Sequence, residues 1–265
     1  MHAQLRNTSI YFDIDGLGLV PDGPGSDHSD LKVAFQPLSE SMQLVFFDHR
    51  GQGRSAKGDP VLYNLDKNVQ DMEALRQHLG LGAIVSIGTS YGGMVAMAHA
   101  AQYPESVSHL VLIVTAAHAG FNARARQIVA ERGTAEQQAV CGQLWAGELD
   151  DVTKLHRYYE VMGPLYSRKF DGEKARLGRE RGIATPEALN RAFAPGGFRP
   201  RVPGCRNSSE TSSTPSWNAA SWRTASCGCT AATAATTSCW PSAANGAAFA
   251  PRAARGAWPR PRRIW

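Results

Sequence analysis

The sequence of 265 residues lacks the long apolar segments that would place it in or across a membrane. No apolar run approaches about 18 residues, the length that a transmembrane helix requires. The N-terminal stretch MHAQLRNTSIYFDIDG has no basic region followed by a hydrophobic segment, which is the pattern of a secretory signal. We therefore expect a cytoplasmic protein that does not associate with a membrane.

Histidine and aspartate are absent from the C-terminal third of the chain, where no His follows His156 and no Asp follows Asp171. Four of the five cysteines lie after residue 200, but Cys227 and Cys229 are too close together for an ordinary zinc knuckle. The sequence therefore predicts no metal site.

Acidic residues are scarce in the same region. Residues 201–265 hold eight Arg and one Glu, so they carry a charge of +7, whereas the whole chain carries +5 and residues 1–200 carry −2. The N-terminal part is thus close to neutral, and we expect no nucleic-acid partner. A nucleic-acid-binding role would depend on the arginines of the tail alone.

The stretch from 208 to 265 contains no Leu, Met, Tyr, Asp, Lys or His. Such a composition offers almost no aliphatic surface to bury and predicts disorder. Scattered Cys and Trp among Ala, Arg, Pro, Ser and Thr are also typical of a GC-rich coding sequence that is translated out of frame. We hypothesise a frameshift near residue 200, which translation of the gene in its other two frames would test.

The N-terminal part alternates between buried strands and amphipathic helices. This order predicts a doubly wound, mostly parallel sheet with right-handed crossovers, whose ligands bind beyond the carboxyl ends of the strands. The expected elements are a strand at the start of 44–55, a helix over 64–79, a strand over 83–87, a helix that Pro104 closes, and a strand over 109–114.

From about Phe121 to Arg191 only helical patterns remain. Thr134 and Gln137 predict a capping box, and one apolar helix face is predicted from Val152, Leu155, Tyr159 and Met162. We therefore expect three regions: an N-terminal core over 1–120, a helical region over 121–200 and a disordered tail over 201–265. An independent helical domain is the alternative for the second region.

A glycine-flanked serine stands between a predicted strand and a predicted helix. Gly88-Thr89-Ser90-Tyr91-Gly92 is a G-x-S-x-G sequence, in which a tight strand-to-helix turn exposes the central hydroxyl at the carboxyl edge of a sheet. The pattern predicts that Ser90 is a nucleophile.

A second motif precedes this one. In LVFFDHRGQGRS a predicted strand is followed by a loop that contains Asp48, Arg50, Gly51, Gly53 and Ser55. Together the two motifs resemble those of the α/β-hydrolase family, in the branch of the proline iminopeptidases. The resemblance extends over about residues 10–200. We assign no chemistry to the Asp and Arg, which we expect to form an ion pair that braces the loop.

The resemblance implies an α/β-hydrolase fold with a helical cap over residues 121–200. It also implies a serine hydrolase that cleaves an ester or amide bond in a small molecule or short peptide, such as an N-terminal proline, without a cofactor. A haloalkane dehalogenase or epoxide hydrolase of the same fold would need Asp in place of Ser90.

The family's triad continues with an acid and then a histidine near the C-terminus, and neither has a matching position here. The late strands have no visible sequence either, so we expect the C-terminal part of the sheet to be missing. The alternative function is therefore a catalytically impaired or non-catalytic hydrolase-like protein. His118 and His28 are the candidate substitute bases near the rim, although a solvated or supporting role is expected for both.

The oxyanion hole is altered in the same way. The family's His-Gly-Gly-Pro-Gly loop corresponds to Pro21-Asp22-Gly23-Pro24-Gly25, with DIDGLGLV as the only candidate for the preceding strand, which suggests a deletion around Val20 to Pro24. We expect the Tyr91 N–H to be one oxyanion donor and the Gly23 N–H to be the second.

Overall fold

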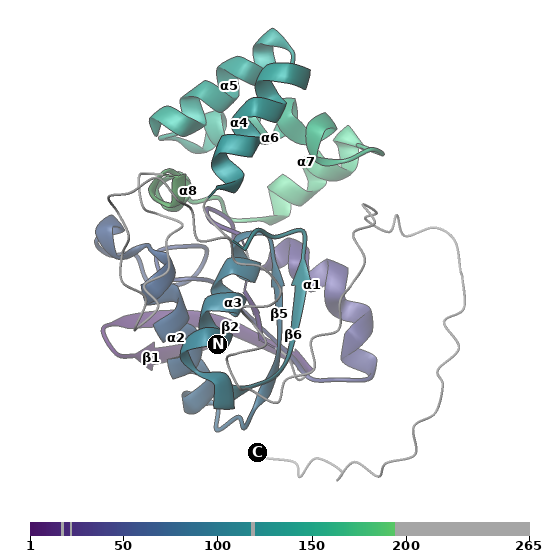
Figure 1. Ribbon diagram of the computed structural model, residues 1–265. Helices are drawn as coiled ribbons and strands as arrows, with labels where there is room; N and C mark the ends of the chain where they lie inside the picture. Colours follow the sequence, from purple (N-terminus) through teal and green to yellow (C-terminus); the bar gives the residue numbers. More distant parts are fainter. Residues whose placement is uncertain (17–18, 22, 118–119, 194–265) are drawn as a thin grey trace. The chain divides into compact units, whose positions relative to one another are not determined.

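The computed structural model describes residues 1–16, 19–21, 23–117 and 120–193. The predictions for the tail and for His118 concern residues outside these ranges. The centre of the described part is a six-stranded sheet in the order β1-β2-β4-β3-β5-β6 (Figure 1). Its strands are β1 (His2–Leu5), β2 (Thr8–Gly16), β3 (Leu19–Pro21), β4 (Leu44–Phe47), β5 (Ile84–Thr89) and β6 (Val107–Ile113).

The sheet is parallel from β4 onward and antiparallel at its N-terminal edge. β3 pairs in parallel with both β4 and β5, and β5 pairs in parallel with β6, whereas β2 is antiparallel to β1 and β4. The stretch DIDGLGLV, expected to supply one strand, instead contributes to the end of β2 and to β3. A strand therefore does precede the Gly23 loop, and the deletion expected around Val20 to Pro24 stays a prediction.

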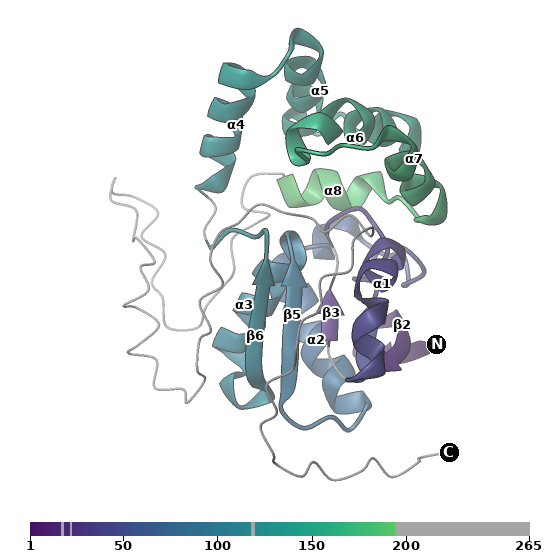
Figure 2. The ribbon, with the colours of Figure 1, turned by 90° about the vertical axis from the view of Figure 1, so that its right-hand side faces the viewer.

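Helices cover both faces of this sheet (Figures 1 and 2). On one face, α2 (Leu65–His78) and α3 (Tyr91–Gln102) bury Val69, Met72 and Val95 in one cluster with side chains of the sheet. On the other face, α1 (Ser29–Phe35) packs Leu31 against Phe46. This is the three-layer arrangement expected of a sheet with parallel strands, which must be buried on both sides.

The helix over 64–79 and the strand over 109–114 are found within two residues of their predicted bounds. Asn64 caps α2 by accepting a hydrogen bond from the Lys67 amide at 3.0 Å, and Gly80 takes a left-handed φ of 62° just after the helix. Short 3₁₀ helices complete this part at η1 (Gln36–Glu40), η2 (Pro60–Leu62) and η3 (Pro104–Ser106).

The region after β6 is helical, as predicted. Its helices are α4 (Phe121–Arg132), α5 (Ala135–Ala146), α6 (Val152–Tyr166), α7 (Gly172–Arg181) and α8 (Pro186–Phe193). α4, α5, α6 and α8 share an apolar cluster of their own, which includes Leu144, Leu155 and Met162. Figures 1 and 2 show the five helices beyond the end of the sheet where β6 finishes. The predicted Thr134–Gln137 capping box is present. Val152, which was expected on the buried face of α6, is exposed, whereas Tyr158 is buried on that face.

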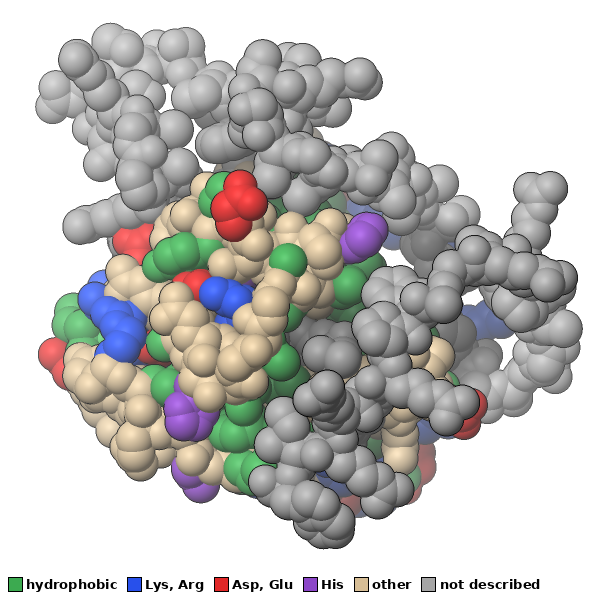
Figure 3. Space-filling model, turned by 90° about the horizontal axis from the view of Figure 1, so that it is seen from below, with side chains coloured by type: hydrophobic (Ala, Val, Ile, Leu, Met, Phe, Trp, Pro, Cys, Tyr) green, Lys and Arg blue, Asp and Glu red, His purple; other side chains and the backbone are tan. Residues whose placement is uncertain are grey.

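Figure 3 shows the described residues at the opposite end, where the visible hydrophobic side chains are scattered among polar ones. In the part of the chain that the structure describes, every helix is too short or too polar to cross a bilayer.

Candidate active site

Ser90 lies at a sharp turn between β5 and α3, as the G-x-S-x-G motif predicts. Its backbone has a φ of 52° and a ψ of −120°, a conformation that a residue with a Cβ seldom adopts. The Ser90 N–H donates to the carbonyl of Ile113 in β6 at 3.0 Å, and the Ser90 side chain is exposed. The neighbouring strand thus holds the turn in the position that presents the hydroxyl.

The glycines around the turn allow strand and helix to approach closely. A Cβ on Gly88 would lie 2.5 Å from the carbonyl oxygen of Gly92, so only glycine fits where β5 meets the first turn of α3. A Cβ on Gly93 would lie 2.6 Å from the side chain of Thr115. Glycine is therefore required at positions 88 and 93 because a side chain at either position would collide with its neighbours.

Thr115 fixes the same turn from the loop after β6. Its hydroxyl donates to the carbonyl of Ser90 at 2.6 Å. The sequence analysis did not identify this residue. Its one sequence signal is its position just beyond a strand that neighbours the motif, at the edge where ligands bind in parallel sheets.

Tyr91, the first residue of α3, is anchored in the core. Its ring is buried, and the side chain of Asn68 donates to its hydroxyl at 2.8 Å. Burial raises the pKa of Tyr91 far above its ordinary value, so the phenol stays neutral. The anchor fixes the backbone at the N-terminus of α3, where the unpaired main-chain N–H groups of a helix point outward along its axis and favour the binding of an anion.

The loop that holds Gly23 is braced by the loop after β4. The side-chain oxygen of Gln52 accepts from the amide of Gly25 at 2.7 Å, and the amide of Thr185 donates to the carbonyl of Gly25 at 2.8 Å. A Cβ on Gly23 would meet nothing within 4 Å. The segment around Gly25 is therefore held on both sides, and a side chain at position 23 would meet no neighbouring atom.

Asp48 and Arg50 do not form the expected ion pair with each other. Asp48 is fully buried and accepts from the amide and Nδ1 of His28, at 2.9 and 2.7 Å, and from the amide of Arg54 at 2.8 Å. Arg50 instead donates two hydrogen bonds to Asp71, both at 2.6 Å. The prediction that these residues brace the loop holds, but each does so with its own partner, because neither could be buried without one.

His28 has the supporting role that the sequence predicts, but it is buried in this network and does not lie at the rim. It is 2 % exposed, and its Nε2 lies 3.3 Å from a carboxylate oxygen of Asp13. Burial alone would lower the pKa of His28, but hydrogen bonds and charge from Asp48 and Asp13 outweigh it and raise the pKa. With both ring nitrogens directed at carboxylates, His28 is stabilised as a cation and is poorly suited to accept a proton.

Ser90 has no base within the described residues. Its hydroxyl makes no hydrogen bond with any of them. His99, another buried histidine, directs its Nε2 to Glu73 at 3.0 Å. The described part of the chain thus contains a complete nucleophile turn without the proton acceptor that would activate it, and it gathers no group of three metal-ligating side chains.

Comparisons with known proteins agree with this arrangement, a serine at a strained strand-to-helix turn of a largely parallel sheet. Residues 19–147 match the family described as alpha/beta hydrolase fold. Two solved structures agree in fold. An alpha/beta fold family hydrolase from Bacillus anthracis has a TM-score of 0.57 and 18% identity, over 72% of this chain and 71% of that protein. E-2-(acetamidomethylene)succinate hydrolase has a TM-score of 0.54 and 19% identity, over 75% of this chain and 72% of that protein. The chain therefore has the α/β-hydrolase fold.

Curated relatives are proline iminopeptidases. The chain is 31% identical to the proline iminopeptidase PfmaB of Pestalotiopsis fici over 58% of this chain and 55% of the relative. It is 36% identical to a proline iminopeptidase of Clostridioides difficile over 37% of this chain and 34% of the relative. The chain thus spans between a third and just over half of the length of these relatives.

Proposed function

We propose that this chain is a serine hydrolase of the proline iminopeptidase type, in which Ser90 attacks the carbonyl of an ester or amide bond. The observation that carries the proposal is the backbone of Ser90, which is held in a strained conformation by the Ile113 carbonyl and the Thr115 hydroxyl. Strain of this kind is maintained only where the surrounding structure enforces it, and it is concentrated at functional sites.

The oxyanion that forms in this reaction would be stabilised by the N–H groups of Tyr91 and Gly23. The first stands at the N-terminus of α3, where the helix dipole favours negative charge. The second belongs to the loop that Asp48 and Gln52 brace. Water would then hydrolyse the acyl-enzyme, and the mechanism needs no metal or organic cofactor.

The proposed substrate is a small molecule or a short peptide, with removal of an N-terminal proline as the specific reaction. Partial similarity to the two proline iminopeptidases supports this choice. The helices α4–α8 would form the cap over residues 121–200, and the contact of Thr185 with Gly25 brings this region directly onto the candidate oxyanion loop.

The second candidate function is that of a hydrolase-like protein without appreciable catalysis. It is favoured by the Ser90 hydroxyl, which makes no hydrogen bond with any described residue. A serine without a base is a weak nucleophile, and the loss of triad groups lowers the rate by several orders of magnitude. If this second candidate is correct, hydrolysis of proline arylamides and activated esters should be close to background.

A fluorophosphonate probe distinguishes the two candidates. The probe reacts with a serine only where its surroundings activate the hydroxyl. Labelling that intact-protein mass spectrometry detects in the chain and not in Ser90→Ala supports the hydrolase. A folded protein that remains unlabelled supports the non-catalytic alternative, and robust hydrolysis that Ser90→Ala abolishes would mean that a base exists which the described residues do not show.

A further inference from the structure

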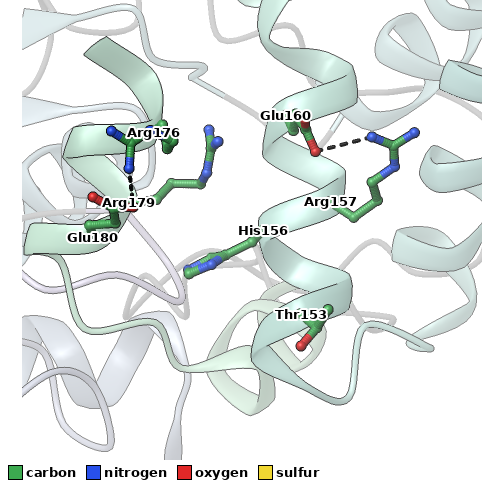
Figure 4. Close-up of a pocket in the computed structure, with 7 residues that line it drawn as sticks. All are labelled: Thr153, His156, Arg157, Glu160, Arg176, Arg179 and Glu180. Carbon is green, nitrogen blue, oxygen red and sulfur yellow. Dashed lines mark hydrogen bonds and ion pairs between the residues drawn. The ribbon is translucent and has the colours of Figure 1, made fainter. Parts of the chain in front are cut away.

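A small hollow lies between α6 and α7, away from Ser90, and its lining contains three arginines and a histidine beside two glutamates (Figure 4). Its volume is about 290 Å³, at the lower end of the size of ligand sites, so it suits a small ligand. The lining consists of Thr153, His156, Arg157 and Glu160 from α6, and of Arg176, Arg179 and Glu180 from α7.

Both carboxylates of the lining are already engaged. Glu160 accepts from Arg157 at 3.0 Å, and Glu180 accepts from Arg176. Each of these arginines has a further carboxylate outside the hollow, Glu136 for Arg157 and Glu173 for Arg176. Arg157 and Arg176 are therefore each paired with two carboxylates, and Arg179 is the arginine of the lining without a carboxylate partner among the described residues.

The remaining polar groups of the lining have no partner among the described residues. They are the guanidinium of Arg179, the imidazole of His156 and the hydroxyl of Thr153. His156 extends from α6 toward α7, and Arg179 extends from α7 toward α6 (Figure 4). Both are partly shielded from solvent rather than fully exposed.

These three groups are hydrogen-bond donors of the kind that bind oxyanions. A guanidinium offers paired N–H groups that match two oxygens, and a protonated imidazole and a hydroxyl add further donors. Burial, with the nearby charge of Arg179, lowers the pKa of His156, and an anion placed between the two side chains would favour the protonated imidazole.

We propose that the hollow between α6 and α7 is a binding site for a small oxyanion, a phosphate or carboxylate group, held by Arg179, His156 and Thr153. The site is separate from the proposed reaction at Ser90 and does not depend on it. Phosphate, with two charges and three or four acceptor oxygens, matches a cation and two further donors better than a monocarboxylate does.

The test is an NMR titration of the full chain with phosphate at constant ionic strength, in which the C–H resonances of the histidines are followed. Binding should shift the His156 resonance in a saturable way and raise the pKa of His156, because the bound anion stabilises the imidazolium. His109, an exposed histidine on β6, serves as an internal reference that should not respond. Acetate in a parallel titration distinguishes a carboxylate site from a phosphate site.

Arg179→Gln should weaken phosphate binding by about tenfold or more, since it removes the charged donor. Arg132→Gln, which removes an exposed arginine in the last turn of α4 that does not line the hollow, is the matched control and should leave binding unchanged. The proposal is wrong if His156 shows no saturable shift with either anion, or if the shift is the same in Arg179→Gln. Saturation by acetate and not by phosphate would restrict the site to carboxylates.

Discussion

Replacement of Ser90 by glycine should stabilise the protein, because the backbone at this position is strained by the presence of a Cβ. A φ of 52° with a ψ of −120° belongs to a region that glycine tolerates and other residues do not. Strain of this kind costs about 1–3 kcal/mol, and glycine loses about 0.4–1 kcal/mol of this gain through the greater freedom of its unfolded chain. The net expectation is a gain of about 1 kcal/mol in the free energy of unfolding.

Ser90→Ala is the control, because it removes the hydroxyl and retains the Cβ. The serine side chain makes no capping hydrogen bond, and the bonds to Ile113 and Thr115 involve only the backbone of residue 90, so both variants keep them. Urea unfolding should rank Ser90→Gly above Ser90→Ala, and the melting temperature should differ by about 2–4 °C. If glycine is no more stable than alanine here, the turn stores no strain and the argument for a functional site loses its basis.

Three further results are expected. Gly88→Ala should lower the free energy of unfolding by about 1–3 kcal/mol, because its Cβ would collide with backbone atoms. Gly142→Ala, at a helical position in α5 where a Cβ meets nothing within 4 Å, should raise that free energy by about 0.5–1 kcal/mol. Chemical denaturation of both variants measures the two changes. Arg50→Leu should cost about 3–5 kcal/mol, since it leaves the buried Asp71 carboxylate with only the more distant Arg6 guanidinium at 3.8 Å, and a loss below about 1 kcal/mol would contradict the buried pair. Because the pKa of His28 is raised in the folded protein, the stabilisation from its charge is complete below pH 6.5 and is lost as the pH rises through the folded pKa. The difference in free energy of unfolding between the chain and Asp48→Asn should therefore become smaller toward alkaline pH. A difference that does not change with pH would refute this.

The sequence predicted the elements that periodicity and local chemistry determine. The Ser90 turn follows from glycines at fixed spacing, α2 from its apolar stripe and Asn64 cap, and the α5 N-terminus from Thr134 and Gln137. Each of these signals lies within one turn or one element of the chain, and a single sequence can therefore reveal it.

The contacts that join distant segments could not be predicted in the same way. His28, the side-chain partner of Asp48, lies 20 residues before it, and Asp71, the partner of Arg50, lies 21 residues after it. No local sequence pattern shows which distant residue pairs with which. Thr115 reaches Ser90 only because β5 and β6 pair in register. β3 was hard to recognise because it has only three residues, too few to display a period.

The outer edge of β6 has a consequence for the behaviour of this protein at high concentration. Among the described residues β6 has one strand neighbour, β5, so the backbone groups of its other edge have no strand of the described sheet opposite them. Val111, Leu112 and Val114 are 41%, 37% and 68% exposed beside that edge. An apolar edge of this kind, with no described strand beside it, is a template for a further strand from any source. Lysine at position 111 should therefore slow concentration-dependent association, because a charge there would be buried without a partner whenever another chain adds to the sheet.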